Sequence, residues 1–220
     1  MAEAITGALC VIPSCLQVGE AFDLKLKLLG AIHPIPCRNG WRTVKPGLGS
    51  PYNLSVERRI QYLDNCPAQW TGELAVLPQA ALAGPARLVF DGTQQGVFDG
   101  DTRPIAHFSG FSFTQPGVHF VEMIEPVSGR RISSNPVWVT ADQPARRLYW
   151  GDPHWHTIFT DGLRCPEELY AFARDEAFLD FGMLTDHMEG LTARQWDYQV
   201  AVTNDYNQAG RFATLVAQEW

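Results

Sequence analysis

The amino-acid sequence predicts two domains of different fold class: a β-sandwich over residues 1–144 and an incomplete α/β domain over residues 145–220. Short strand-like runs separated by turn-forming residues fill the first part, which is typical of antiparallel sandwiches. Strand-like and helix-like segments alternate in the last part, which is typical of a parallel sheet. The pattern changes after Gln143 and Pro144, where we place the domain boundary.

The clearest strand of the first domain is expected at residues 22–28, where apolar and polar residues alternate with the period of a half-buried strand. Turn-forming pairs such as Asp91-Gly92 separate the expected strands from one another. Residues 34–78 show weak periodicity, and the sequence predicts no element there. Further strand-like runs cover residues 86–90, 118–124 and 136–140.

The second domain is expected to have a βαβαβ order. A first helix is predicted at residues 166–177, because Pro166 suits a first helical turn and acidic residues follow it at the positive end of the helix. A second helix is predicted at residues 192–209, with Gly210 ending it. The strands that alternate with these helices are expected at residues 147–152, 178–185 and 211–218.

Charge and composition exclude several classes of function. The formal net charge is −7 and no cluster of Lys and Arg occurs, which argues against binding to nucleic acid or to anionic membranes. No apolar run approaches the roughly 20 residues that span a bilayer, and the N-terminal residues do not resemble a signal peptide. We therefore expect a cytoplasmic protein. The five cysteines include no CxxC pair and are expected to be reduced thiols.

Residues suited to metal binding follow all three strands of the predicted parallel sheet. His154 and His156 follow the first strand, Asp186 and His187 end the second, and Glu219 ends the third. The carboxyl ends of parallel strands meet at one edge of a sheet, and side chains two residues apart on a strand point the same way. Each motif alone occurs by chance, but their combination predicts a metal site with nitrogen and oxygen ligands.

Three motifs lie at these strand ends: Asp152-Pro-His154-Trp-His156-Thr157 with Asp161-Gly162, then Thr185-Asp186-His187, and then Glu219. Together they resemble the motifs of the PHP superfamily, the polymerase and histidinol phosphatase metallohydrolases. In that family D-x-H-x-H-(T/S) precedes D-G, T-D-H follows a strand, and a Glu ends another strand. Tyr-Trp-Gly-Asp at 149–152 and Ser-Asn-Pro at 134–136 also resemble a bacterial branch of unknown function with a β-rich N-terminal region.

The resemblance implies a distorted TIM-type barrel that holds up to three divalent metal ions, of zinc, manganese or iron. Glu219 is implied to bridge the first and second ions. Asp152 and Asp186 are implied to orient the metal-bound imidazoles. The implied chemistry is hydrolysis of a small-molecule ester, typically a phosphoester, by metal-activated water. The implied metal ligands are His154, His156, Asp161, His187 and Glu219.

The family supplies further ligands after the point where this sequence stops, at Trp220. Three strands and two helices also cannot close a barrel, and the third strand would leave an apolar edge. We therefore expect the front part of a longer hydrolase, with little turnover of its own and with self-association through the sheet edge. The alternative is a non-catalytic binding or assembly module built on the β-sandwich. The sequence leaves phosphomonoesters, phosphodiesters and other esters open as substrates.

Overall fold

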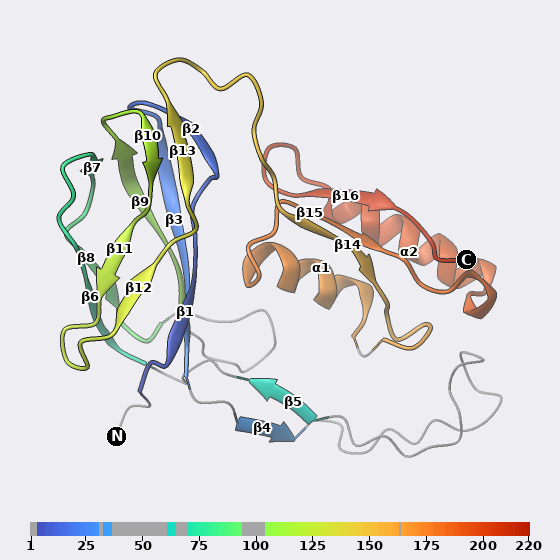
Figure 1. Cartoon of the computed structure of the whole chain (residues 1–220). Helices are drawn as coiled ribbons and strands as arrows, with labels where there is room; N and C mark the ends of the chain where they lie inside the picture. Colours follow the sequence, from blue (N-terminus) through green and yellow to red (C-terminus); the bar gives the residue numbers. More distant parts are fainter. Residues whose placement is uncertain (1–3, 31–32, 37–60, 65–69, 94–103, 163) are drawn as a thin grey trace. The chain divides into compact units, whose positions relative to one another are not determined.

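The computed structural model describes residues 4–30, 33–36, 61–64, 70–93, 104–162 and 164–220 (Figure 1). The chain divides into two compact units. The first unit comprises Met1–His33 and Asp64–Tyr149, and the second comprises Pro34–Leu63 and Trp150–Trp220. The second unit therefore includes part of the middle segment, for which the sequence predicts no element. In that segment β4 (His33–Pro36) and β5 (Gln61–Asp64) form a two-stranded sheet, while residues 37–60 and 65–69 lie outside the described residues.

The described residues of the first unit form three β-sheets, in agreement with the β-rich sequence pattern (Figure 1). The first has the strand order β1 (Gly7–Val11), β3 (Ala21–Leu29), β9 (Ile105–Phe113), β7 (Leu82–Ala83). The second has the order β10 (Gly117–His119), β13 (Val137–Thr140), β2 (Cys15–Gln17). The third has the order β12 (Arg131–Ser133), β11 (Glu122–Ile124), β6 (Gly72–Val76), β8 (Arg87–Phe90).

All three sheets contribute to one hydrophobic core. The strand predicted at residues 22–28 is confirmed as β3, in which Phe22 and Leu24 are buried and Asp23 between them is exposed. Leu16 of β2 and Met123 of β11 reach the same core from the other two sheets. The strands predicted at 86–90 and 136–140 are also confirmed, as β8 and β13.

The single strand predicted at residues 118–124 is wrong. The structure has two strands there, because β10 pairs with β13 whereas β11 pairs with β12 and β6. The chain changes sheets at Val121, whose N–H donates to Oγ of Ser134 over 2.9 Å. The backbone N–H of Ser134 returns a bond of 2.9 Å to the carbonyl of Val121. The Ser134 hydroxyl thus takes the place of a backbone carbonyl on a neighbouring strand. No local pattern in the sequence predicts this contact.

The second unit contains a three-stranded parallel sheet with the order β14 (Gly151–Trp155), β15 (Phe181–Leu184), β16 (Ala213–Val216). Helices α1 (Pro166–Asp175) and α2 (Ala193–Tyr206) connect these strands, and a short 3-10 helix η1 (Met188–Gly190) follows β15. This arrangement confirms the predicted βαβαβ order. The barrel that the family resemblance implies stays a prediction.

Several boundaries in the second unit differ from the prediction, and two of these differences have a visible cause. The first strand of the sheet starts at Gly151 rather than at residue 147, and the backbone of Trp150 is instead held by the Asp180 carboxylate, at 2.8 Å from Trp150 N. The second helix ends at Tyr206, where Asn207 adopts an extended conformation. Gly210, which was expected to end that helix, lies in the following turn with a φ of 75°.

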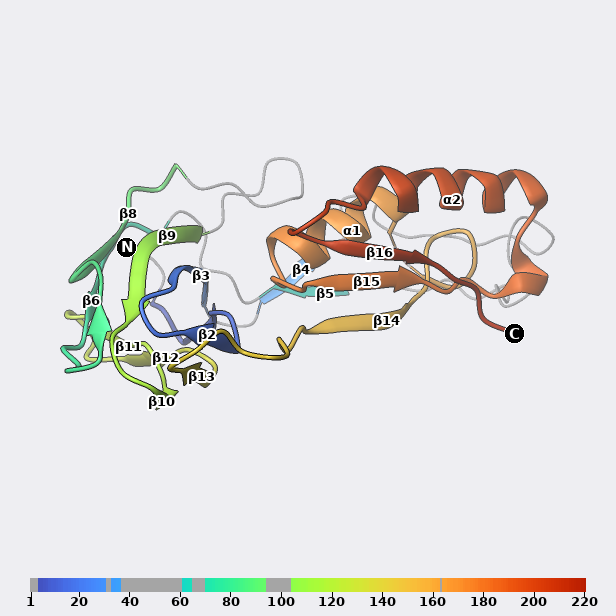
Figure 2. The same ribbon diagram turned by 90° about the horizontal axis from the view of Figure 1, so that it is seen from above.

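Both helices cover the same face of the parallel sheet (Figure 2). Their packing forms a second core around Tyr170, whose ring is fully buried and whose hydroxyl lies 2.9 Å from Oγ1 of Thr203. Leu184 of β15 and Val202 of α2 complete the contact between sheet and helices. In the described part of the chain, neither helix has the length and apolar character needed to cross a bilayer. Because Trp155 of β14 and Leu184 of β15 pack in this second core, the core holds both strands, and the loops that follow them start from defined positions.

Candidate metal centre

Backbone hydrogen bonds beyond the strands keep the three strand ends in register. After β14 and β15, the N–H of Thr185 donates to the carbonyl of Trp155 over 2.8 Å. After β15 and β16, His187 and Glu219 form a parallel bridge. The N–H of Met188 then donates to the carbonyl of Glu219 over 3.0 Å. These contacts place side chains from three strands at one edge of the sheet.

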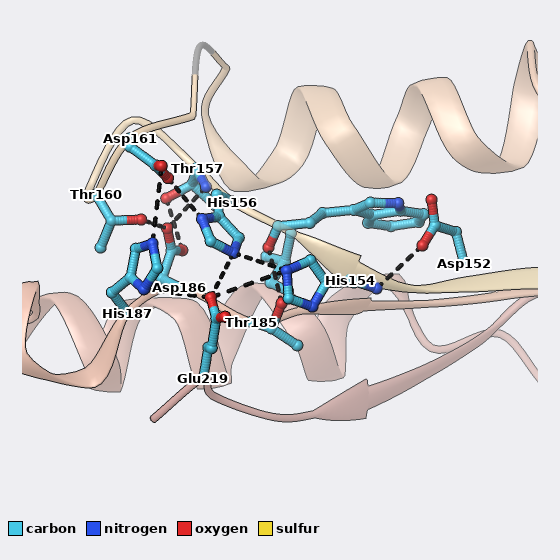
Figure 3. Close-up of polar contacts among 12 residues, drawn as sticks. Asp152, His154, His156, Thr157, Thr160, Asp161, Thr185, Asp186, His187 and Glu219 are labelled. Carbon is cyan, nitrogen blue, oxygen red and sulfur yellow. Dashed lines mark hydrogen bonds and ion pairs between the residues drawn. The ribbon is translucent and has the colours of Figure 1, made fainter. Parts of the chain in front are cut away.

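The imidazoles of His154 and His156 point the same way, with their Nε2 atoms 3.2 Å apart (Figure 3). Trp155 between them packs against Tyr170 on the helix-covered face. The Oε2 atom of Glu219 lies 2.9 Å from Nε2 of His156 and 3.8 Å from Nε2 of His154. Three potential ligand atoms from β14 and the end of β16 therefore converge.

His187 approaches the same carboxylate from the end of β15. Its Nδ1 lies 3.2 Å from Oε2 of Glu219, and its Nε2 lies 3.7 Å from Oδ2 of Asp161. The structure thus contains two sets of three donors, each close enough together to bind one ion. The first set is His154, His156 and Glu219, and the second is His156, Asp161 and His187. All five residues predicted as ligands belong to these sets.

Asp161 fixes the orientation of His156. Its Oδ1 lies 2.5 Å from Nδ1 of His156, which assigns the ring proton of the neutral imidazole to Nδ1. Burial acts to raise the pKa of Asp161, but the hydrogen bond with His156 and the positive charge that His156 and His187 carry when protonated outweigh it and hold this pKa below its usual value. With the proton on Nδ1, the lone pair of Nε2 faces Glu219 and His154. This is the arrangement in which a carboxylate prepares an imidazole for a metal.

Glu219 has a buried carboxylate oxygen without a hydrogen bond. Its Oε2 is surrounded by imidazole nitrogens, yet among the described residues none of them donates to it with acceptable geometry. A buried carboxylate oxygen without a donor costs free energy, on the order of 1–3 kcal/mol or more. Facing lone pairs on nitrogen and oxygen repel each other unless a cation or proton lies between them. This atom therefore marks the position where positive charge fits.

Asp186 holds the loop after β14, and the orientation of an imidazole by this residue, which the family resemblance implies, stays a prediction. The side chain is fully buried. Its Oδ1 accepts from the N–H of Thr157 over 2.7 Å and its Oδ2 accepts from the hydroxyl of Thr157 over 2.8 Å. The hydroxyl of Thr160 also donates to Oδ1. The loop that carries Asp161 is thereby fixed to the end of β15, and sequence reasoning missed both threonines in this role.

Asp152 contacts the backbone of His154, and its implied role in orienting an imidazole also stays a prediction. Its Oδ1 accepts from the backbone N–H of His154 over 3.0 Å, and the side chain lies apart from the convergent imidazoles (Figure 3). It therefore stabilises the local backbone at the bulge of β14, where the register with β15 shifts between Asp152 and Trp155.

An open cleft of about 550 Å³ adjoins the centre. Trp155 lines this cleft together with Arg164 and Leu169, and the sequence analysis missed the latter two. The signal for Arg164 was its position just before the Pro166 helix, on the loop that carries Asp161. The lining residues are His154, Trp155, His156, Asp161, Gly162, Arg164 and Leu169.

No protein-family model, curated protein or solved structure matches this chain.

Proposed function

We propose that this chain carries the metal centre of a metal-dependent hydrolase that acts on phosphoesters. The single observation behind the proposal is the convergence of three imidazoles on Oε2 of Glu219, which has no hydrogen bond of its own. The motifs that resemble the PHP superfamily support the same function. A TIM-type barrel that binds up to three ions belongs to this proposal as well.

The donor set fits a divalent ion such as zinc, manganese or iron, since imidazole and carboxylate ligands suit all three. His154, His156 and Glu219 would hold the first ion. Asp161 and His187 would hold a second ion, because Oδ2 of Asp161 stays free to face Nε2 of His187 while Oδ1 accepts from His156. Glu219 could help to hold either ion, since its Oε2 lies 2.9 Å from Nε2 of His156 and 3.2 Å from Nδ1 of His187.

A bound divalent ion lowers the pKa of water and stabilises charge on phosphoryl oxygens. In the hydrolysis, a water oxygen bonds to phosphorus, the bond from phosphorus to the ester oxygen breaks, and the leaving alcohol takes up a proton. Asp161 keeps the ring proton of His156 on Nδ1, so that Nε2 presents its lone pair throughout. Asp186 keeps the Asp161 loop in place through Thr157 and Thr160.

Hydrolysis assays with 4-nitrophenyl phosphate and bis(4-nitrophenyl) phosphate test the proposal. The chain loaded with zinc, manganese or iron should release nitrophenol slowly from at least one of them, in line with the little turnover expected of it, and the metal-stripped chain should release none. Replacing His156 or His187 by Ala should remove this activity, whereas replacing His119, which belongs to the first unit, should leave it unchanged. Equal rates with and without metal, or in the wild type and His156→Ala, would refute the proposal.

A second candidate function is binding by the β-sandwich, and one observation favours it. On β10 and β13, Val118 and Trp138 are cross-strand partners, and they are 65% and 63% exposed. Exposed aromatic residues beside apolar ones are frequent in binding surfaces. If this surface is the functional one, Trp138→Ala would abolish binding of a partner while His156→Ala would not.

A further inference from the structure

The cleft beside the metal centre combines one cation with an apolar wall. Among the described residues that line it, Arg164 is the one permanently cationic side chain. Trp155 and Leu169 supply apolar surface in the same cleft, and the donor atoms of His154, His156 and Asp161 form another part of its lining. A molecule bound in this cleft would therefore meet metal ligands, a guanidinium group and apolar surface at once.

Local contacts hold Arg164 at a defined point. The N–H of Ile158 donates to the carbonyl of Arg164 over 2.9 Å, which closes the loop that carries Asp161. The Nη1 atom of Arg164 lies 3.7 Å from Oε1 of Glu168. The other oxygen of Glu168 accepts from the N–H of Cys165 over 3.2 Å at the start of α1. Glu168 thus ties the guanidinium group to the rigid end of a helix, while 28% of the Arg164 side chain stays exposed.

The apolar wall is equally fixed. The ring of Trp155 packs edge-on against Tyr170, with centroids 5.9 Å apart. A Cβ atom added at Gly182 would lie 2.0 Å from the same ring, so the indole lies directly against the backbone of β15. Leu169 packs on the core from α1. An apolar group bound here would contact a surface that needs no rearrangement.

We infer that Arg164 binds phosphoryl oxygens of the substrate and that Trp155 and Leu169 contact its leaving group. The substrate class is then a phosphomonoester of an apolar or aromatic alcohol, and this inference rests on the proposed function. A phosphomonoester has three non-bridging oxygens and nearly two negative charges at neutral pH. Two oxygens can face the paired donors of an arginine while the third faces the metal. A phosphodiester has only two non-bridging oxygens and one charge, so pairing both oxygens with the arginine leaves no third oxygen for the metal.

Binding of non-hydrolysable probes tests this inference without relying on turnover. Calorimetry would measure phenylphosphonate, methylphosphonate and diphenyl phosphate against the metal-loaded chain. The metal content of each variant would be measured first. Arg164→Gln removes the cation but leaves the backbone bond from Ile158 to the carbonyl of residue 164 in place. Arg194→Gln is the matched control, since Arg194 is exposed at the start of α2.

Arg164→Gln should weaken phenylphosphonate binding by about tenfold or more, the size expected when a paired, charge-assisted contact is lost. Arg164→Lys should give an intermediate loss, because lysine keeps the charge but not the paired donors. Arg194→Gln should bind like the wild type. Phenylphosphonate should bind more tightly than methylphosphonate, and diphenyl phosphate should depend less on Arg164.

The outcomes separate the two proposals. If the variants bind metal normally and Arg164→Gln binds phenylphosphonate as well as the wild type does, the substrate inference is wrong and the metal centre stands. If diphenyl phosphate is the tighter ligand and loses as much affinity in Arg164→Gln, the substrate is a diester and the inference is again wrong. If the wild-type chain binds no metal, the proposed function fails, and the inference fails with it.

Discussion

The Oε2 atom of Glu219 lies 2.9 Å from Nε2 of His156, and no hydrogen bond joins them. The reason lies on the other side of the imidazole, where Asp161 accepts the ring proton on Nδ1. Two groups with lone pairs are thus held face to face by the fold. A protein maintains such a contact at a cost to stability, which a bound cation removes.

Replacing Glu219 by Gln should therefore raise the stability of the metal-free protein while it weakens metal binding. The variant removes a buried charge that has no donor, so we expect the metal-free protein to gain about 1 kcal/mol in free energy of unfolding. Metal affinity should fall at least about tenfold, because an uncharged amide is a poor ligand. Urea denaturation and metal titration measure the two effects. The control is Glu122→Gln on β11, which is exposed. A variant that is less stable without metal and binds metal normally would contradict this account.

Because the Asp186 carboxylate is buried and bonded to a loop, we expect Asp186→Asn to destabilise the protein much more than Asp152→Asn does. Both carboxylate oxygens of Asp186 accept hydrogen bonds from Thr157 or Thr160. Asp186→Asn leaves only one acceptor oxygen and puts an amide NH2 group in place of the other. We expect a loss of about 2–3 kcal/mol in the free energy of unfolding, together with weaker metal binding. Asp152→Asn should change stability by less than about 0.5 kcal/mol, because its side chain is exposed and accepts one bond. Similar losses in both variants would mean that Asp186 does not hold the loop.

Gly162 is required by a close approach of two backbone segments. A Cβ atom at this position would lie 1.8 Å from the carbonyl oxygen of His156, which belongs to the backbone and cannot rotate away. Gly162→Ala should therefore displace the loop, move Asp161 away from His156 and reduce metal affinity at least about tenfold. Gly7→Ala is the control, since the nearest atom to its Cβ would be Leu29 Cδ1 at 3.9 Å. Normal metal binding by Gly162→Ala would show that the loop tolerates displacement.

The parts of the structure that the sequence predicts are those set by local patterns. The β3 alternation, the Pro166 start of α1 and the order of strands and helices all follow from residues close together in the chain. The two histidines of β14 also follow from a local rule, because alternate side chains of a strand share a face.

The unpredicted parts are set by contacts between distant residues. The pairing of Val121 with Ser134 splits one expected strand into two, and the bond from the Thr160 hydroxyl to Asp186 holds a loop in a way that the sequence does not predict. In both contacts the two partners lie far apart in the sequence, at separations of 13 and 26 residues. Asp161 orients His156 by reaching back five positions, a contact that depends on the tight turn at Gly162. These side-chain contacts form only once the sheet and its loops are assembled.

The contacts of Asp175 with two arginines should make the stability of the protein depend on pH. At the end of α1 it binds Arg174 through both oxygens, at 2.9 and 2.6 Å, and its Oδ1 also lies 2.9 Å from Nη2 of Arg211. Burial acts to raise the pKa of Asp175, but the two arginines outweigh it and hold this pKa below its usual value. The carboxylate therefore stabilises the fold fully above the unfolded pKa of about 3.9, and this contribution is lost as the pH falls through the lower folded pKa.

Denaturation of the wild type and Asp175→Asn over a series of pH values tests this behaviour. We expect the variant to be less stable by about 1–2 kcal/mol at neutral pH, and the difference to shrink toward zero in acid. Asp197→Asn on the exposed side of α2 is the control and should show little difference at any pH. A difference between wild type and Asp175→Asn that stays constant down to acid pH would contradict the assignment.

The most direct measurement of the central claim is the metal content of the purified chain after incubation with zinc or manganese and removal of unbound ions. The wild type should retain at least one ion per chain, and His156→Ala should retain much less, because His156 belongs to both donor sets. His119→Ala in the first unit should retain as much as the wild type. If the wild type retains no metal, or if His156→Ala retains the same amount, the convergent imidazoles are not a metal centre and the proposed hydrolase is wrong.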